Sequence, residues 1–393
     1  MRTVYDEWTR LQKVIIGRSF DLSNFNIDYK NKILFNYDKT ISERHQHFSN
    51  IEYDGNRTTT DSLLDLVEGN LSGLKRIHDE TNEDLDVLAD ICKQFGTFVV
   101  RPDILYPIET EWRHPMQVRD TIGKIGDTVF EVYTSSWDRM YENLNCRNIL
   151  IDEFEQGARY ISMPFPIYER KPTNTIDDID IKNEISNKEI QSYDNQGQIL
   201  GDTAAFMKCG KHIFHTHSNP KTKLKKQHSQ ISMTNNGREW WKREFPSHEF
   251  VEMNAYGHVD GKISILRPGL VLAWNKDHIP EIMKDWDVIL IENKATYSGK
   301  QIKDLCEEKG VKNYPWHHLL GVSQETRFDA NCLSLDENTV ITSGYDKDLS
   351  DKLKKYNIEM IPWVNRWNFL WSGGAHCCSV DLAREGKLID YFS

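Results

Sequence analysis

The chain has 393 residues, 38% of them hydrophobic and 28% charged, a balance that excludes a disordered chain. Its 49 Lys and Arg residues against 60 Asp and Glu residues give a formal net charge of -11, which argues against a general nucleic-acid-binding surface and suits a small cationic substrate. No stretch is apolar enough for a membrane span, the first residues predict no leader peptide, and the seven cysteines are typical of reduced thiols, so we expect a soluble cytoplasmic protein.

The N-terminal part predicts an incomplete unit of strands and one helix. Lys13–Ile16 is an apolar strand, and a helix is expected to begin near Asn82 and to stop at Gly96. The apolar face of this helix consists of Leu85, Leu88, Ile91 and Phe95. Thr97–Val100 is predicted as the closing strand, and the missing strand is expected from Cys377–Leu382 at the other end of the chain.

Two further units follow the order strand, strand, helix, strand. In the first, these segments are Thr121–Ile125, Thr128–Tyr133, a helix near Arg147–Gln156, and Tyr160–Met163. In the next, they are Ala204–Lys208, His212–His215, a helix near Arg238–Arg243, and His248–Met253.

The same order recurs twice more toward the C-terminus. The fourth unit is predicted as Ile263–Leu266, Leu270–Trp274, a helical stretch over Ile279–Trp286, and Val288–Ile291. The fifth is predicted as Cys332–Leu335, Thr339–Thr342, a helix containing Leu349 and Leu353, and Ile358–Ile361. We expect this last helix to stop at Asn357 in the left-handed conformation, and the last strand to end at Pro362.

Five units of one pattern favour a closed array in which each unit packs on its neighbours. Closure by the C-terminal strand predicts one domain over residues 1–393, with the polar stretch Lys171–Gln198 as a surface insertion. An ordinary α+β protein with unrelated hairpins is the alternative, because such short patterns also arise by chance.

A glycine-rich segment near the C-terminus is the first candidate for chemistry. In Ser372–Cys378, two glycines allow close backbone approach, and the cysteines that follow stand at the start of a strand. A cysteine thiolate is a nucleophile if a nearby cation lowers its pKa. The alternative is that these cysteines are small buried apolar groups.

Polar residues also precede the first strands of other units. His258 and Asp260 share one side of an extended segment, and a histidine beside a carboxylate can transfer protons near neutral pH. Asp120 and Asp202 occupy the equivalent positions in the two preceding units. Each of these residues alone is more commonly a cap, turn or solvated group, but a closed array would bring them together with the cysteine.

Several carboxylates, one histidine and one cysteine suit a guanidinium group. Carboxylates hold this planar cation in bidentate fashion, and its central carbon stays open to thiolate attack. A competing metal interpretation rests on His212, His215 and His217, but His212 faces the opposite side of its strand. The basic run Lys221–Lys226 is interpreted as a solvated loop.

Five segments along the chain carry motifs in a recognisable order. They are Asp6–Arg18; Arg119–Thr121 with Gly126–Asp127 and Glu131; Asp202–Phe206; His258–Asp260 followed by Leu266–Leu272; and Gly373–Cys377 with Arg366 upstream. Together they resemble the glycine amidinotransferases and their relatives that act on inosamine phosphates. The resemblance implies the pentein fold, a five-bladed pseudosymmetric α/β propeller around a central active site.

The resemblance also implies roles for particular residues. Cys377, rather than Cys378, is expected to be the nucleophile, His258 the acid and base, and Asp202 the carboxylate that orients both guanidinium and histidine. Substrate-binding roles carry over to Asp120, Asp260 and Arg366. The resemblance implies no cofactor and no metal, small-molecule substrates, no nucleic-acid or membrane partner, and pairing as a homodimer.

Some positions depart from the family pattern. Gln324 and Glu325 stand where the family has serines that grip the amino-acid end of the donor, and Asp277 or His278 stands where it has an arginine. Gly261 is similar to the residue in hydrolytic relatives. We therefore expect transfer of the amidino group of arginine, or of a similar guanidine, to a primary amine. The alternatives are a guanidine hydrolase that uses water, and a non-catalytic binder of guanidines.

Overall fold

The computed structural model describes residues 2–21, 71–105, 114–134, 139, 141–166, 198–216, 233–255, 257–292, 330–366 and 373–393. The predicted insertion Lys171–Gln198, apart from Gln198, lies outside these ranges, as do His217, the run Lys221–Lys226, Gln324 and Glu325.

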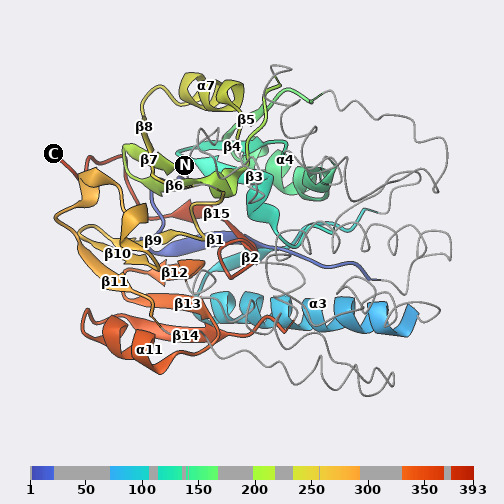
Figure 1. The fold of residues 1–393 in the computed structure, drawn as a ribbon. Helices are drawn as coiled ribbons and strands as arrows, with labels where there is room; N and C mark the ends of the chain where they lie inside the picture. Colours follow the sequence, from blue (N-terminus) through green and yellow to red (C-terminus); the bar gives the residue numbers. More distant parts are fainter. Residues whose placement is uncertain are drawn as a thin grey trace, which may run out of the picture.

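Five three-stranded sheets make up the described part of the fold (Figure 1). In each sheet the first strand is antiparallel to the second, and the second is parallel to the third. The first three sheets are β15–β1–β2 (Ser379–Arg384, Leu11–Ile16, Phe98–Val100), β3–β4–β5 (Ile122–Ile125, Thr128–Glu131, Arg159–Ser162) and β6–β7–β8 (Phe206–Cys209, His212–His215, Glu249–Glu252). The other two are β9–β10–β11 (Ile263–Arg267, Leu270–Ala273, Asp287–Leu290) and β12–β13–β14 (Leu333–Asp336, Thr339–Ser343, Glu359–Trp363). The predicted five-unit propeller, including closure by the C-terminal strand, is confirmed.

Helices cross from the second to the third strand in four of the units, and they lie around the outside of the strands (Figure 1). They are α3 (Leu71–Gln94), α4 (Arg147–Glu155), α7 (Asn235–Glu244) and α11 (Lys347–Lys354). None of the helices in the described ranges combines the length and apolarity needed to cross a membrane.

The helical stretch predicted around Ile279–Trp286 contains a single 3₁₀ turn and no α-helix. The fourth unit instead has two short 3₁₀ turns, η7 (Lys276–His278) and η8 (Glu281–Met283). Pro280 separates them, and the residue before it, Ile279, is extended with ψ of 124°. A proline disfavours helical backbone in the residue that precedes it, so η7 and η8 do not join into one helix.

The start of the first helix also differs from the prediction. Helix α3 is already formed at Leu71, so Asn82 is an internal residue and not the cap. Its side chain accepts a hydrogen bond from the Ser19 N–H at 2.9 Å and donates one to the Phe20 carbonyl. Asn82 thus fastens the chain after β1 to the helix. The predicted stop at Gly96 is confirmed by its positive φ of 80°.

In the fifth unit, Asn357 has the predicted left-handed conformation, with φ of 58°. The expected strand end at Pro362 is wrong, because β14 continues to Trp363 and Pro362 pairs in register with Thr342. Because β14 is an edge strand, a backbone N–H on its outer side has no neighbouring strand to bind. A proline, which lacks this N–H, is therefore tolerated in β14.

The hydrophobic core lies between neighbouring units. Phe130 from the second unit packs edge-on against Trp241 from the third, with ring centroids 4.7 Å apart. Similar clusters join the first unit to the second, the third to the fourth and the fourth to the fifth. The fifth unit meets the first where Trp363 donates a hydrogen bond from Nε1 to the Asp84 carbonyl on α3 at 2.7 Å. Each unit therefore depends on its neighbours to bury its apolar face.

The N-terminal segment crosses two units before entering β1. Val4 forms an isolated bridge with Gly126, and Asp6 forms one with Cys209. This path carries the next residue, Glu7, into the buried interior, where it is 4% exposed.

Candidate active site

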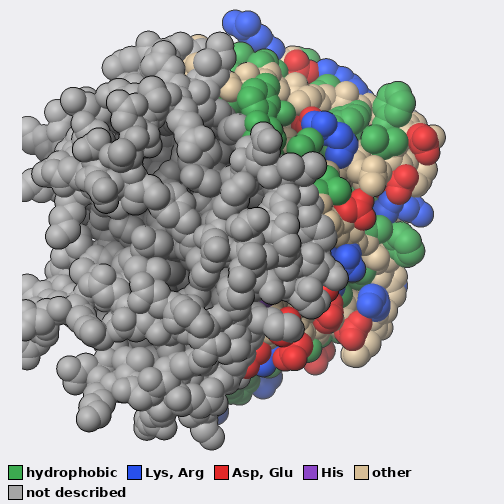
Figure 2. All heavy atoms as spheres, turned by 90° about the vertical axis from the view of Figure 1, so that its right-hand side faces the viewer, with side chains coloured by type: hydrophobic (Ala, Val, Ile, Leu, Met, Phe, Trp, Pro, Cys, Tyr) green, Lys and Arg blue, Asp and Glu red, His purple; other side chains and the backbone are tan. Residues whose placement is uncertain are grey.

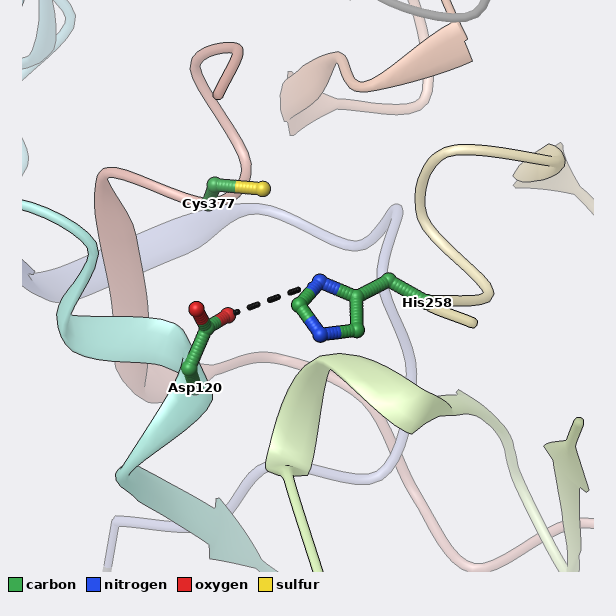
Figure 3. Close-up of side chains that lie close together, drawn as sticks. All are labelled: Asp120, His258 and Cys377. Atoms are coloured by element: carbon green, nitrogen blue, oxygen red, sulfur yellow. Dashed lines mark ion pairs between the residues drawn. The ribbon is translucent and has the colours of Figure 1, made fainter. Parts of the chain in front are cut away.

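The polar residues that precede the first strands meet at one point. Asp120 ends a 3₁₀ turn before β3, Asp202 precedes β6, His258 and Asp260 precede β9, and Cys377 precedes β15. Ligand atoms of Asp120, His258 and Cys377 all lie within 4.8 Å of one another, and Figure 3 shows how these three side chains converge. The structure thus brings together five of the six predicted site residues.

His258 lies between two carboxylates. Its Nε2 is 3.0 Å from Asp202 Oδ2, and its Nδ1 is 3.8 Å from Asp120 Oδ1, the ion pair drawn in Figure 3. Burial favours the neutral ring, but the charge of Asp120 and the hydrogen bond that His258 donates to Asp202 outweigh it and raise the pKa of His258 to about 9. At neutral pH the ring is therefore an imidazolium that can give up a proton.

Cys377 is 5% exposed and lies in an electronegative environment. Burial, together with the charges of Asp260 and Asp120, raises the pKa of the Cys377 thiol well above its ordinary value. The thiol donates to Asp260 Oδ2 at 3.3 Å, and the sulfur accepts from Asn331 Nδ2 at 2.9 Å. In the absence of a bound cation the group is thus a neutral thiol.

Three carboxylates of the group each have one oxygen that accepts no hydrogen bond from the described residues. Asp120, Asp202 and Asp260 are at most 4% exposed, and the Oδ1 atom of each has no hydrogen-bond partner among the described residues. A buried charged oxygen without a donor is costly. These three atoms therefore favour a ligand that brings several N–H groups.

Arg139 lies directly behind Asp120 and was not among the residues predicted from the sequence. Its buried guanidinium donates to Asp120 Oδ2, to both oxygens of Glu142 and to the Gln117 carbonyl. Because Oδ2 of Asp120 is taken by Arg139, only Oδ1 faces the site.

A second chain of charges supports Asp260. His376 Nδ1 is 3.0 Å from Asp260 Oδ2, and His376 Nε2 is 3.3 Å from Glu7 Oε2. Glu7 in turn pairs with Lys208 at 2.5 Å and lies 3.8 Å from Arg119 Nη1. Burial acts to raise the pKa of Asp260, but the hydrogen bond from His376 and the electrostatic attraction to this ring lower that pKa below its ordinary value. Asp260 therefore stays ionised.

Arg366 is the predicted site residue that the structure does not bring into this group. Its backbone and guanidinium bind Asp84, and the guanidinium also contacts Glu83 at 2.7 Å and Glu80, all on α3. Of the positions that depart from the family pattern, Asp277 is exposed, and the His278 ring packs edge-on against Trp274.

Of the three histidines in the metal interpretation, the two that the structure describes, His212 and His215, belong to no cluster with metal-ligand spacing among the described residues. His212 lies 3.4 Å from Glu249, and His215 Nδ1 is 2.9 Å from the Thr216 carbonyl. Within the described ranges, the one cluster with metal-ligand spacing is Asp120, His258 and Cys377. A carboxylate, an imidazole and a thiolate are ligands that zinc accepts, but here the imidazole and the thiol would both first have to lose a proton.

Asn331 is the second residue that sequence reasoning missed. It stands two residues before β12, the same place that Asp120 takes before β3 and Cys377 takes before β15. A search for polar residues at that position in the fifth unit would have found it.

Comparison with known proteins gives a consistent result over nearly the whole chain. No protein-family model matches. The chain is 23% identical to the mitochondrial glycine amidinotransferase of Xenopus tropicalis over 99% of this chain and 84% of the relative. It is 23% identical to inosamine-phosphate amidinotransferase 1 of Streptomyces glaucescens over 80% of this chain and 84% of the relative.

Solved structures show the same fold. The inosamine-phosphate amidinotransferase of Streptomyces griseus superposes with a TM-score of 0.64 at 20% identity, covering 100% of this chain and 99% of that one. An amidinotransferase of the saxitoxin biosynthetic pathway from Microseira wollei gives a TM-score of 0.61 at 19% identity, covering 99% of both. The comparisons confirm the predicted resemblance to the amidinotransferases, and with it the prediction of an enzyme of the transferase class.

Proposed function

We propose that this chain transfers the amidino group of arginine, or of a similar guanidine, to a primary amine through a covalent amidino-Cys377 intermediate. The observation that carries the proposal is the set of three buried carboxylate oxygens without hydrogen-bond donors among the described residues, on Asp120, Asp202 and Asp260, around a thiol and an imidazolium. A guanidinium offers five N–H donors in one plane, and its positive charge offsets the buried negative charges.

In the first half of the reaction, the Cys377 sulfur attacks the central carbon of the guanidinium. The bound cation offsets the carboxylate charges that otherwise disfavour the thiolate, so the Cys377 thiol releases its proton to solvent as the cation binds. The C–S bond forms and the C–N bond to the donor breaks. His258 gives its proton to the leaving amine, so the donor departs as a neutral amine and the amidino group remains on sulfur as a cation.

In the second half, a primary amine attacks the same carbon. His258, now neutral, takes a proton from the attacking nitrogen, and the C–S bond breaks. The sulfur regains a proton from solvent when the product cation leaves. Atoms and charge balance over the cycle, and His258 returns to the imidazolium state. Asp202, 3.0 Å from Nε2, holds the ring in place through both steps.

The hydrolytic alternative finds no support in Gly261. A Cβ at this position would meet only the His258 carbonyl oxygen, at 3.7 Å, which is an ordinary contact. The site therefore does not require glycine there, and the residue does not discriminate between transfer and hydrolysis.

The described part of the face drawn in Figure 2 suits a small-molecule substrate better than a nucleic acid. On the face drawn in Figure 2, the described acidic and basic side chains are interspersed, and no broad basic patch covers that part. All six cysteines in the described ranges are free, in keeping with the expected cytoplasmic location. A homodimer stays a prediction.

One assay tests the proposed function. The protein is incubated with arginine, with and without a panel of primary amines, and ornithine, citrulline and ammonia are measured. Ornithine that forms only when an amine is present is the expected result. Citrulline and ammonia without any amine would replace transfer by hydrolysis, and the absence of turnover with every guanidine tested would favour a non-catalytic binder.

A further inference from the structure

Asn331 holds Cys377 with both ends of its side-chain amide. The Oδ1 atom accepts a hydrogen bond from the Cys377 backbone N–H at 3.0 Å, and the Nδ2 atom lies 2.9 Å from Sγ. The backbone N–H can only donate, so the amide oxygen must face it and the NH₂ group must face the sulfur. The orientation of the amide is therefore fixed by chemistry.

Burial and close packing against Gly374 also hold the Asn331 side chain in place. The side chain is buried, and the backbone of Gly374 packs directly against it. A Cβ at Gly374 would stand 2.5 Å from the Asn331 carbonyl oxygen and 2.7 Å from Oδ1. The second glycine of the glycine-rich segment is thus required so that Asn331 can reach the sulfur.

The electrostatic setting gives this contact its importance. Asp260 and Asp120 place negative charge close to the sulfur and oppose its ionisation. Among the described residues, Asn331 supplies the N–H group that points at Sγ. A hydrogen bond donated to a charged acceptor is about twice as strong as one to a neutral acceptor, so this contact gains strength when the thiol becomes a thiolate.

We propose that Asn331 is a catalytic residue that positions the Cys377 sulfur and stabilises its thiolate. The assignment rests on the proposed role of Cys377 as the nucleophile. It also gives the fifth unit a function at the axis, since the other four units contribute Asp120, Asp202, the pair His258 and Asp260, and Cys377.

The test measures the thiol itself and needs no substrate. The rate of Cys377 alkylation by iodoacetamide, followed by peptide mass mapping, is recorded against pH for the wild type, Asn331→Ala and the isosteric Asn331→Asp. Loss of a hydrogen bond to a charged group slows alkylation of Asn331→Ala by about tenfold or more at pH 8, and the added carboxylate slows Asn331→Asp further, by roughly 100-fold. In both variants the pH profile moves to higher pH. Asn338→Ala, in an exposed turn of the same unit, is the matched control and keeps the wild-type profile.

Turnover gives a second, independent reading. The kcat for a guanidine donor should fall at least about tenfold in Asn331→Asp, with little change in KM, because Asn331 does not contact the three free carboxylate oxygens. A folded Asn331→Asp protein, judged by its thermal unfolding midpoint, with the wild-type alkylation profile would overturn the assignment. A shifted alkylation profile in a chain that turns over no guanidine would keep the stabilisation of the Cys377 thiolate by Asn331 and would remove the proposed function instead.

Discussion

Two acidic clusters of this chain differ in how their charges are matched. In the cluster on α3, Asp84, Glu80 and Glu83 surround Arg366, whose guanidinium contacts all three. In the axial cluster, Asp120, Asp202 and Asp260 surround His258 and Cys377, and each carboxylate keeps an oxygen without a described donor.

The number of donors available to the carboxylates distinguishes a binding site from a structural ion pair. The α3 cluster contains its own cation and needs nothing more, so it joins the first unit to the fifth. The axial cluster has too few donors for its buried acceptors, and a planar cation would supply them. Substitutions should accordingly damage chemistry at the axis and stability at α3.

The largest effect is expected from the nucleophile. Cys377→Ser should lower turnover by more than roughly a thousandfold, because a serine hydroxyl is far harder to ionise than a thiol and nothing here activates it. The measurement is ornithine release from arginine in the presence of an amine. Cys378→Ala, which changes the buried neighbouring cysteine, is the control and should keep most of the activity. Equal loss in both variants would mean that the segment, rather than the sulfur of Cys377, is what matters.

The histidine of the axial cluster should follow. His258→Gln removes the proton donor and should lower kcat by about a hundredfold or more. In the wild type, the raised pKa of His258 predicts that kcat/KM falls as the pH rises through about 9, where the imidazolium loses its proton. A kcat/KM profile that stays flat up to pH 10 would exclude the imidazolium as the acid. His248→Gln, at a partly buried histidine of the third unit, should leave the profile unchanged.

Neutralising one carboxylate should give a smaller loss, mainly in binding. Asp120→Asn keeps the shape of the side chain but removes a charge from the donor site, so KM for arginine should rise roughly 10- to 100-fold. Arg139 retains both oxygens of Glu142 in this variant, so its own charge stays matched. Glu83→Gln in the α3 cluster is the matched substitution and should not change KM. A rise in KM in both variants would erase the distinction between the clusters.

Much of the fold could be predicted because its signals are local. Gly96 and Asn357 mark helix ends through their own backbone conformations, and short apolar strands mark the sheets. The axial residues were found because the repeat places them at equivalent positions before the first strands. Asn82 was misassigned because a capping preference is local, whereas its actual contact with Ser19 spans 63 residues.

The remaining site residues depend on contacts that sequence spacing does not encode. Asn331 meets Cys377 across 46 residues, and Arg139 reaches Asp120 from a stretch without strand or helix periodicity. Arg366 was grouped with the site because it stands upstream of the glycine-rich segment. Its side chain points to α3 instead, where three acidic residues on one helix bind it. These partners lie 282 to 286 residues away in the chain, so proximity in sequence could not indicate them.

Arg366 gives the smallest expected effect on chemistry and the sharpest test of the comparison. Burial raises the pKa of Asp84 to about 6, and hydrogen bonds from Arg366 act against this rise, so Arg366→Ala leaves a buried carboxyl without its partner. We expect the free energy of unfolding, measured with urea, to fall by about 1–3 kcal/mol. KM for arginine should stay within about twofold of the wild type in folded protein, since every described contact of Arg366 goes to α3 or to the backbone there. A large rise in KM without loss of stability would instead indicate that Arg366 binds the substrate, even though it is paired with three acidic residues.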